Sequence, residues 1–319
     1  PAAHYAQGFH PTGTCGAFGA ALAAARIFKL DADGMTRALG IAGSQAAGSM
    51  EFLSDGSFTK RFHAGWAAHA GLIAALLARE GFTGPASIFE GPHGFLHAYS
   101  PVSDPQKVLA GWGDPYEIMK TSIKPHACCR YKQGSIDCIL EIIRGNGLSG
   151  EDIEKVMVSV LKAGMALVAE PRESKLNPRG IVDAQFSMPF GAAVAIIYGR
   201  ASLDQYSPEN IASPRVRSLM QRVFCRENPE IEKEFPRKWP AEVEITTRDG
   251  RKYLSSIQYP KGDPENPLSW DEIIAKFNSL SLSVFSEKQC CEIVDRVRAV
   301  EKESDISLLM ETLVAPSAK

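Results

Sequence analysis

Three basic side chains gather near the start of a predicted alanine-rich helix. The segment 56–71 reads GSFTKRFHAGWAAHAG and contains Lys60, Arg61 and His63. Residues three apart share one face of a helix, so Lys60 and His63 are expected to be neighbours. Lysine and arginine attract carboxylates, and imidazole exchanges protons near neutral pH. The segment indicates an anion site with an acid or base beside it. The alternative is a solvated helix start whose charges face water.

A second basic cluster of the same kind occurs later, in the segment KPHACCRYK. Lys124 and Arg130 supply positive charge there. Arg130 could bind a carboxylate through two parallel hydrogen bonds, and His126 could transfer a proton. Cys129 would be a nucleophile if the neighbouring cations lowered its pKa. For the cysteines we favour the alternative, that they are small, buried, apolar side chains.

The remaining histidines differ in what their surroundings indicate. His10 lies in GFHPTG, just ahead of the first predicted helix, and is either an acid or base or a capping or core residue. His69, within an apolar helix, is interpreted as a core histidine. His93 and His97 lie in a Gly/Pro loop without carboxylate companions, so no metal site is predicted. The chain has no GxGxxG, Walker, GxSxG or HExxH motif, which favours acid/base chemistry without a cofactor.

Size and composition are those of an ordinary globular protein. The chain has 319 residues, 45% hydrophobic and 23% charged, and a net charge of −2. This charge gives no general attraction to nucleic acid or to anionic membranes, and no apolar run is long enough to span a bilayer. Seven cysteines, with adjacent pairs at 128–129 and 290–291, fit a reducing, cytoplasmic compartment rather than a disulfide framework.

Periodicity divides the chain into three parts. Residues 1–115 are predicted to form a tightly packed helical domain, because apolar and small residues recur at helical spacing over 16–28, 33–48 and 63–80. The chain has no initial methionine and enters an apolar helix almost at once. We therefore expect it to be the later portion of a longer protein.

The middle part, residues 116–262, mixes predicted helices and strands. Residues 155–161 (KVMVSVL) alternate like a strand, and 242–257 contain a hairpin whose Asp-Gly pair is a strong turn signal. Helices are predicted at 130–144 and 183–198. Residues 263–319 return to amphipathic helices. The predicted class is mainly α with an α+β domain, and the middle part is interpreted as a lid inserted into the helical domain.

Seven short motifs follow one another along nearly the whole chain. They read GFHPTGTCGAFGAALAAARIF, ALGIAGSQAAG, TKRFHAGWAAHAG, GFTGP with the following FEG, SIKPHACCR, AQFSMPFGAA and YPKGDPENPLS. Jointly, and in this order, they resemble the MmgE/PrpD family, which includes 2-methylcitrate dehydratases, cis-aconitate decarboxylases and iminodisuccinate epimerases. The resemblance implies a helical domain, an α+β lid domain and C-terminal helices that pack back on the helical domain. It also implies a homodimer without metal or cofactor.

The resemblance further implies an active site between the domains and a lyase or isomerase activity. Family members move a proton on a carbon next to a carboxylate of a small di- or tricarboxylate, and then eliminate water, lose CO2 or invert the centre. Carried over by motif, His10, Lys60 and Lys124 match the family's active-site positions and are predicted to be catalytic. Four further residues of the basic clusters are predicted, from their own chemistry and spacing, to bind the substrate: Arg61, His63, His126 and Arg130.

Two departures from the family pattern keep an alternative open. Family members carry an earlier helical region with an Asp-rich motif and a further histidine, and nothing in this sequence matches it. The middle motif has Phe190 where many members have tyrosine, so a phenolic proton donor is expected to be absent there. The alternative to an enzyme is a non-catalytic fragment or pseudoenzyme that binds a carboxylate or a partner chain. A helical scaffold without a ligand is the third hypothesis.

Overall fold

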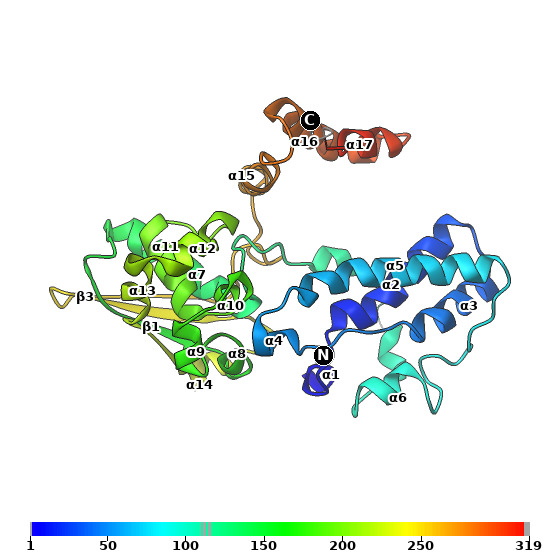
Figure 1. Ribbon diagram of the computed structural model, residues 1–319, viewed down its shortest axis with the longest axis horizontal. Coiled ribbons are helices and arrows are strands. Elements are labelled where there is room, and N and C mark those ends of the chain that lie inside the picture. Colours follow the sequence, from blue (N-terminus) through cyan, green and yellow to red (C-terminus); the bar gives the residue numbers. More distant parts are fainter. Residues whose placement is uncertain (1, 110, 112, 114–115, 316–319) are drawn as a thin grey trace. The chain divides into compact units, whose positions relative to one another are not determined.

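The chain divides into two units, Pro1–Tyr116 and Glu117–Lys319, which differ in architecture. The computed structural model describes residues 2–109, 111, 113 and 116–315. Helices make up the described part of the first unit, and the second unit adds a four-stranded sheet (Figure 1). The predicted class, mainly α with an α+β part, is confirmed. The division falls one residue after the predicted boundary at 115.

Small residues let the two long helices of the first unit pack closely. The unit consists of α1 (Ala2–Ala6), α2 (Pro11–Ile27), α3 (Ala32–Gly43), α4 (Phe52–Asp55), α5 (Thr59–Arg79), α6 (Phe95–Tyr99) and the 3-10 turn η1 (Pro105–Val108). A Cβ atom added to Gly71 of α5 would lie 2.4 Å from the Cβ atom of Ala20 and 2.5 Å from the backbone nitrogen of Ala21, both on α2. Only a hydrogen atom fits there. Alanines of α2, α3 and α5 complete the core with Phe18 and Ile41.

Helix ends in this unit depart from the prediction at places that matter for the site. α5 begins at Thr59 instead of residue 63, so Lys60 and His63 are both helical. α3 ends at Gly43 instead of residue 48, and the chain that follows is not helical. α2 begins early because Pro11 occupies its first turn, where the missing N–H of proline costs no hydrogen bond.

The sheet of the second unit is mixed. It contains β1 (Ile153–Val160), β2 (Val223–Glu227), β3 (Ala241–Thr247) and β4 (Lys252–Ile257) in the order β2-β1-β3-β4. β1 pairs parallel with β2 and antiparallel with β3, and β3 pairs antiparallel with β4. Buried and half-buried residues alternate along β3, as expected for a strand with one covered face. The strand and hairpin predictions are confirmed. β2 was missed because VFCRE carries no alternating apolar pattern.

Helices α7 and α11 lie over this sheet and enclose the larger core with it (Figure 1). The helices and turns of the second unit are η2 (Glu117–Lys120), η3 (Arg130–Lys132), α7 (Gln133–Asn146), α8 (Lys162–Val168), α9 (Arg172–Leu176), α10 (Ile181–Gln185), α11 (Met188–Tyr198), η4 (Leu203–Gln205), α12 (Pro208–Ala212), α13 (Pro214–Met220), α14 (Pro229–Glu232), α15 (Trp270–Ser281), α16 (Glu287–Arg298), η5 (Val300–Lys302) and α17 (Ser307–Thr312). In the described parts of the chain, no helix is both long and apolar enough to cross a membrane.

The single helix predicted over 183–198 is wrong. α10 ends at Gln185, and α11 begins at Met188. The hydroxyl of Ser187 accepts a hydrogen bond from the backbone N–H of Phe190 at 3.1 Å and so caps the new helix. A cap of this kind satisfies a first-turn N–H that a continuous helix would have paired internally. The break leaves backbone carbonyls of α10 available to other partners.

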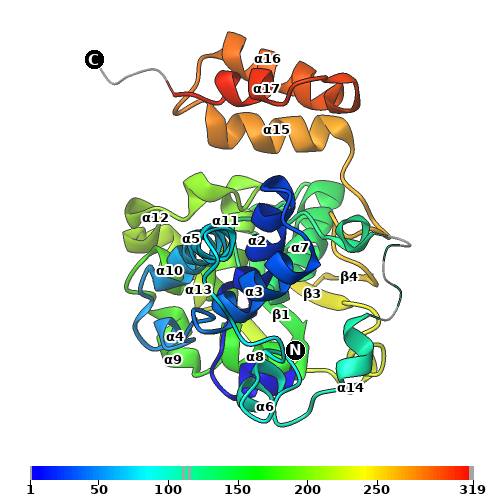
Figure 2. The same cartoon turned by 90° about the vertical axis from the view of Figure 1, so that its right-hand side faces the viewer.

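The last described helices, α15 to α17, form a C-terminal group (Figure 2). α16 packs against α17, with Cys290, Ile293 and Leu309 buried. The expectation that residues 263–319 pack on the helical domain stays a prediction, and its last four residues lie outside the described chain.

Candidate active site

Two imidazoles from distant parts of the first unit meet in a direct hydrogen bond. His10 lies just before α2, and His63 lies in the second turn of α5. Their Nδ1 atoms are 2.9 Å apart, and both residues are buried. Such a bond needs a proton on one Nδ1 atom and none on the other. The two rings therefore hold complementary tautomers. Both residues were predicted candidates, but the contact between them was not predicted.

A bridge between two loops positions His10. Phe9 and Ser49 form an isolated antiparallel bridge, and the backbone N–H of His10 donates to the carbonyl of Gly48 at 2.9 Å. A Cβ atom on Gly48 would lie 3.2 Å from the His10 carbonyl oxygen and 3.6 Å from Nδ1 of His63. Glycine at this position therefore lets the loop pass directly beside the imidazole pair.

Burial and a neighbouring ammonium group favour neutral imidazoles in this cluster. Burial, together with the charges of Lys60 and His63, lowers the pKa of His10 to about 4, and burial is the largest cause. Burial also lowers the pKa of His63, again with a contribution from Lys60. The Nζ atom of Lys60 lies 5.7 Å from the centroid of the Phe52 ring, which both imidazoles contact edge-on. At neutral pH the cluster therefore presents two neutral imidazoles beside one ammonium group.

Hydrogen bonds behind His10 restrict the orientation of its ring. The Thr12 hydroxyl lies 3.2 Å from Nε2 of His10, so both ring nitrogens have partners. The Thr14 hydroxyl lies 3.4 Å from the His10 carbonyl oxygen and 2.9 Å from Nε2 of His4. His4 is buried. Sequence reasoning missed it, because a histidine six residues before His10 shows no spacing that would link it to the motif.

The other predicted residues of α5 lie on its exposed side. Arg61 is exposed, and its guanidinium carbon lies 5.1 Å from the ring centroid of Phe58. His69 is also exposed and stacks on Trp66 with the ring centroids 5.1 Å apart, so its interpretation as a core histidine is wrong. The structure thus brings His10, Lys60 and His63 together and leaves Arg61 on the surface.

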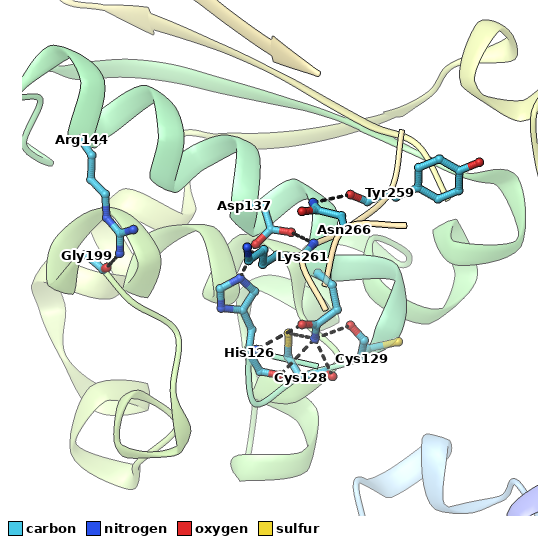
Figure 3. Close-up of polar contacts among 10 residues, drawn as sticks. His126, Cys128, Cys129, Asp137, Arg144, Gly199, Tyr259, Lys261 and Asn266 are labelled. Carbon is cyan, nitrogen blue, oxygen red and sulfur yellow. Dashed lines mark hydrogen bonds and ion pairs between the residues drawn. The ribbon is translucent and has the colours of Figure 1, made fainter. Parts of the chain in front are cut away.

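In the second unit, a carboxylate orients the imidazole of His126 (Figure 3). Nε2 of His126 lies 2.9 Å from Oδ1 of Asp137 on α7. Oδ2 of Asp137 accepts the backbone N–H of Lys261 at 2.8 Å. A carboxylate that accepts from Nε2 leaves Nδ1 as the acceptor nitrogen of the neutral ring. Asp137 was not predicted, since a single aspartate within an apolar helix carries no catalytic signal by itself.

The amide of Gln133 holds the main chain of the loop 123–129. Gln133 is completely buried at the start of α7. Its Nε2 atom donates to the carbonyls of His126 at 3.1 Å and Cys128 at 3.2 Å. Its Oε1 atom accepts the backbone N–H of His126 at 3.2 Å. One buried amide thereby fixes the direction in which the His126 side chain leaves the loop.

Two lysines come close together at this loop. Lys124 is exposed, and its ammonium group donates to the Cys128 carbonyl at 3.3 Å. The ammonium group of Lys276, on α15, donates to the backbone carbonyl of Lys124. Burial and the charge of Lys124 lower the pKa of Lys276. Ammonium groups close enough to repel favour an anion beside them. The contribution of Lys276 was not predicted.

Arg130 already has a carboxylate partner within the protein. Its Nη2 atom lies 2.6 Å from Oδ2 of Asp263, and its guanidinium carbon lies 4.6 Å from the ring centroid of Trp239. Asp263 is only 3% exposed. The contact with Asp263 uses only Nη2, so the guanidinium keeps further N–H donors. Arg130 thus helps to hold the loop in place, and its predicted role in substrate binding stays a prediction.

Comparison with known proteins bears on both units. The MmgE/PrpD N-terminal domain matches residues 1–107, and the MmgE/PrpD C-terminal domain matches residues 126–300. The chain belongs to the MmgE/PrpD family. The resemblance carried by the sequence motifs is thus confirmed.

Several curated relatives are similar to this MmgE/PrpD chain. A cis-aconitate decarboxylase of Aspergillus terreus is 29% identical over 97% of the chain and 65% of its own length. The cis-aconitate decarboxylase of Mus musculus is 24% identical over 98% of the chain and 63% of its own length. A mitochondrial 2-methylcitrate dehydratase of Yarrowia lipolytica is 25% identical over 38% of the chain and 24% of its own length. The chain therefore spans less than two thirds of the length of these relatives.

A buried lysine lies beside the loop of this MmgE/PrpD chain and was not predicted. Lys132 is completely buried, which lowers its pKa to about 8. Its ammonium group donates to the carbonyls of Ala184 at 3.1 Å and Gln185 at 3.3 Å, where α10 ends. The Tyr206 hydroxyl lies 3.4 Å away. Within a basic motif a lysine is expected at the surface, so no sequence pattern indicated that Lys132 lies in the core.

The cysteines of the MmgE/PrpD chain are all free thiols. Burial raises the pKa of Cys128, and it raises the pKa of Cys138 and Cys225 to about 12. A protonated thiol is a poor nucleophile, which supports the interpretation of Cys128 as a small, buried, apolar side chain; Cys129 is half-buried, and its interpretation stays a prediction. Phe190 is also completely buried, with its ring centroid 5.5 Å from that of Tyr206. Among the described residues, no group of three or more His, Cys, Asp or Glu side chains could hold a metal ion.

Proposed function

We propose that this chain carries active-site residues of a lyase for small di- or tricarboxylates that works without a cofactor. The observation that carries the proposal is the buried His10–His63 pair with the ammonium group of Lys60 beside it. Relatives named cis-aconitate decarboxylase and 2-methylcitrate dehydratase support this substrate class. Loss of CO2, loss of water and inversion of a centre all move a proton at a carbon next to a carboxylate, so the proposal includes all three.

The imidazole pair is proposed to accept the proton. Removing a proton next to a carboxylate creates an aci-carboxylate with extra negative charge, which Lys60 would stabilise more than it stabilises the ground state. A bound substrate carboxylate would also offset the effect of Lys60 on the imidazoles and raise the pKa of His10. The Nδ1–Nδ1 bond would then spread the charge of the protonated ring over His10 and His63.

The second unit is proposed to contain carboxylate-binding groups of its own. Lys124 and Lys276 are close enough for their charges to interact, and an anion would relieve their repulsion. His126, oriented by Asp137, adds a ring nitrogen that can accept or, once protonated, donate a hydrogen bond. We therefore propose Lys124 as a catalytic cation and His126 as a substrate-binding residue.

Proton NMR in D2O is the experiment that tests this function. The full chain is incubated with cis-aconitate, citrate and 2-methylcitrate, and both substrate loss and exchange of carbon-bound protons are followed. We expect His10→Gln and Lys60→Met to lower the rate by about 100-fold or more. Matched controls are His69→Gln, an exposed histidine of the same unit, and Lys107→Met, an exposed lysine. Both controls should keep the wild-type rate.

Each outcome decides between the hypotheses. If His10→Gln and Lys60→Met both keep full turnover, the residue assignment is wrong. Binding of a carboxylate without exchange or turnover would favour the non-catalytic alternative. If none of the acids binds or exchanges, the proposed substrate class is wrong.

We also propose a homodimer in a reducing, cytoplasmic compartment. The seven free thiols support the compartment, and the family resemblance supports the dimer. Light scattering of the purified chain and fractionation of cells that express it would test the two proposals separately.

A further inference from the structure

A cleft in the second unit gathers arginines away from the candidate active site. It has a volume of about 430 Å³ and lies between the start of β1, helices α11 and α13 and the β3–β4 turn. In Figure 1, the hairpin and α13 mark this end of the sheet. The lining residues are Gly150, Glu151, Ile197, Arg215, Ser218, Leu219, Arg222 and Arg248. Three arginines thus face one carboxylate, although the whole chain has a net charge of −2.

The single lining carboxylate does little to neutralise the cleft. Glu151 forms an ion pair with Arg215, at 3.3 Å, and both side chains are well exposed, at 70% and 59%. Exposed pairs of this kind are weak and exchange readily with other partners. Two further carboxylates nearby have partners of their own: Asp152 accepts from Ser149, and Asp249 pairs with Arg251.

Arg222 is held in position by main-chain groups that carry no full charge. Its Nη1 atom donates to the carbonyl of Ile153 at 2.9 Å and lies 3.5 Å from that of Gly150. Arg248 is exposed on the turn, anchored by its backbone N–H to the Asp152 carbonyl at 2.8 Å. In the part of the chain that the structure describes, neither Arg222 nor Arg248 forms an ion pair. Two guanidinium charges therefore remain for a ligand.

The chemistry and size of the cleft select its ligand. Guanidinium groups bind carboxylate and phosphate oxygens through paired hydrogen bonds. Ser218 adds a hydroxyl, while Ile197 and Leu219 supply apolar wall that strengthens such bonds by lowering the local dielectric. The volume suits a small molecule. We propose that this cleft binds a small oxyanion with at least two negative charges, either a phosphate compound or a polycarboxylate.

The cleft is a site of its own within the second unit. α7 starts at Gln133, which holds the loop of the candidate active site, and ends at Asn146, just before the residues that open the cleft. At a rise of 1.5 Å per residue, this helix separates its two ends by about 20 Å. None of the lining residues belongs to the loop 123–129. Binding in this cleft therefore does not depend on the proposed function.

Backbone amide NMR of the isotope-labelled full chain tests the proposal, with inorganic phosphate, pyrophosphate and citrate as separate probes at low ionic strength. We expect at least one probe to shift the amides of Gly150 and Ser218 in a saturable way. Arg248→Ala should weaken this binding about tenfold, the usual effect of losing one charged hydrogen-bond donor. Arg248 is suited to the test because it is exposed, so its removal should leave the fold intact. Arg237→Ala, an exposed arginine paired with Glu234, is the matched control.

The outcomes separate the ligand classes from one another. Binding by phosphate and pyrophosphate but not citrate assigns the site to phosphate compounds, and the reverse assigns it to polycarboxylates. Unchanged Gly150 shifts in a Lys124→Met variant would confirm that the candidate active site is not involved. The proposal is overturned if no probe shifts Gly150 at millimolar concentration, or if Arg248→Ala binds as tightly as Arg237→Ala.

Discussion

The two units hold their candidate residues in different ways. In the first unit, two titratable side chains bond directly to each other, with Nδ1 atoms 2.9 Å apart. In the second unit, the candidate side chains contact separate carboxylates: His126 contacts Asp137, and Arg130 contacts Asp263. Two groups that share a proton titrate as a coupled pair, whereas groups held by separate partners respond to a substitution independently. A change at His10 or His63 is therefore expected to alter its neighbour, whereas a change at His126 or Arg130 is expected to stay local.

The two units also differ in the contacts that hold the surrounding backbone in place. The first unit depends on close approach of backbones, because Gly71 lies against α2 and Gly48 lies against the imidazole pair. The loop of the second unit depends on side chains, above all on the amide of Gln133. Backbone contacts cannot relax by rotating a side chain, so the first unit should tolerate added volume less well.

The largest expected effect is that of Gly71→Ala. The new methyl group would lie 2.4 Å from the Cβ atom of Ala20, so α2 and α5 must move apart. We expect the free energy of unfolding to fall by about 3 kcal/mol. Urea denaturation followed by circular dichroism measures it. Gly65→Ala, on the same helix with nothing within 4 Å, should instead stabilise by about 0.5–1 kcal/mol. Equal effects at both positions would contradict the close approach.

Gln133→Glu is expected to lower the free energy of unfolding by less than Gly71→Ala. The substitution replaces the Nε2 donor by an oxygen that faces the carbonyls of His126 and Cys128. Leaving two buried acceptors without a donor should lower the free energy of unfolding by about 2 kcal/mol. Amide hydrogen exchange should then increase in the loop 123–129 and stay unchanged in α5. Gln221→Glu, at an exposed position, serves as the control. Protection of the loop equal to that of the wild type would show that another group holds it.

A third prediction concerns stability in mild acid. The pKa of His10 is lowered from 6.5 to about 4 in the folded chain, so between these values the unfolded chain binds more protons. The stabilising contribution of neutral His10 is therefore complete above about pH 6.5 and is lost as the pH falls towards 4. Urea denaturation at several pH values should show a shallower loss for His10→Gln than for the wild type. His69→Gln should lose stability as steeply as the wild type. If the free energy of unfolding falls equally with pH in all three proteins, neutral His10 does not make the expected contribution to stability.

The smallest expected effect is the coupling within the first cluster. Lys60→Met removes a cation that lowers the pKa of both His10 and His63, so both values should rise. The pKa of His10 should nevertheless stay below 6.5, because burial is the largest cause of its shift. Titration of the imidazole signals by NMR measures both values, with Lys107→Met as the control. A rise in only one of the two pKa values would show that the charge of Lys60 acts on only one of the two imidazoles.

Short-range signals in the sequence predicted the local structure well. The Asp249–Gly250 pair forms the predicted hairpin turn, with φ of +85° at Gly250, a conformation that suits glycine. The shared face of Lys60 and His63 follows from helical spacing alone. The prediction failed at Ser187, where a cap interrupts an apolar run that periodicity reads as one helix. Caps and helical spacing both act over a few residues. At Ser187 the cap decides the structure, and helical spacing alone predicted the wrong one.

Composition and motif order alone were enough to establish the helical first unit, the two basic clusters and the family. Only the tertiary structure decided which side chains meet. His10 pairs with His63 across 53 residues of sequence, and Asp137 pairs with the backbone of Lys261 across 124. Local spacing carries no information about such partners, because they depend on how the packed core returns distant segments to one place. Burial, which lowers the pKa of His10 and hides Lys132, likewise exists only once that core has formed.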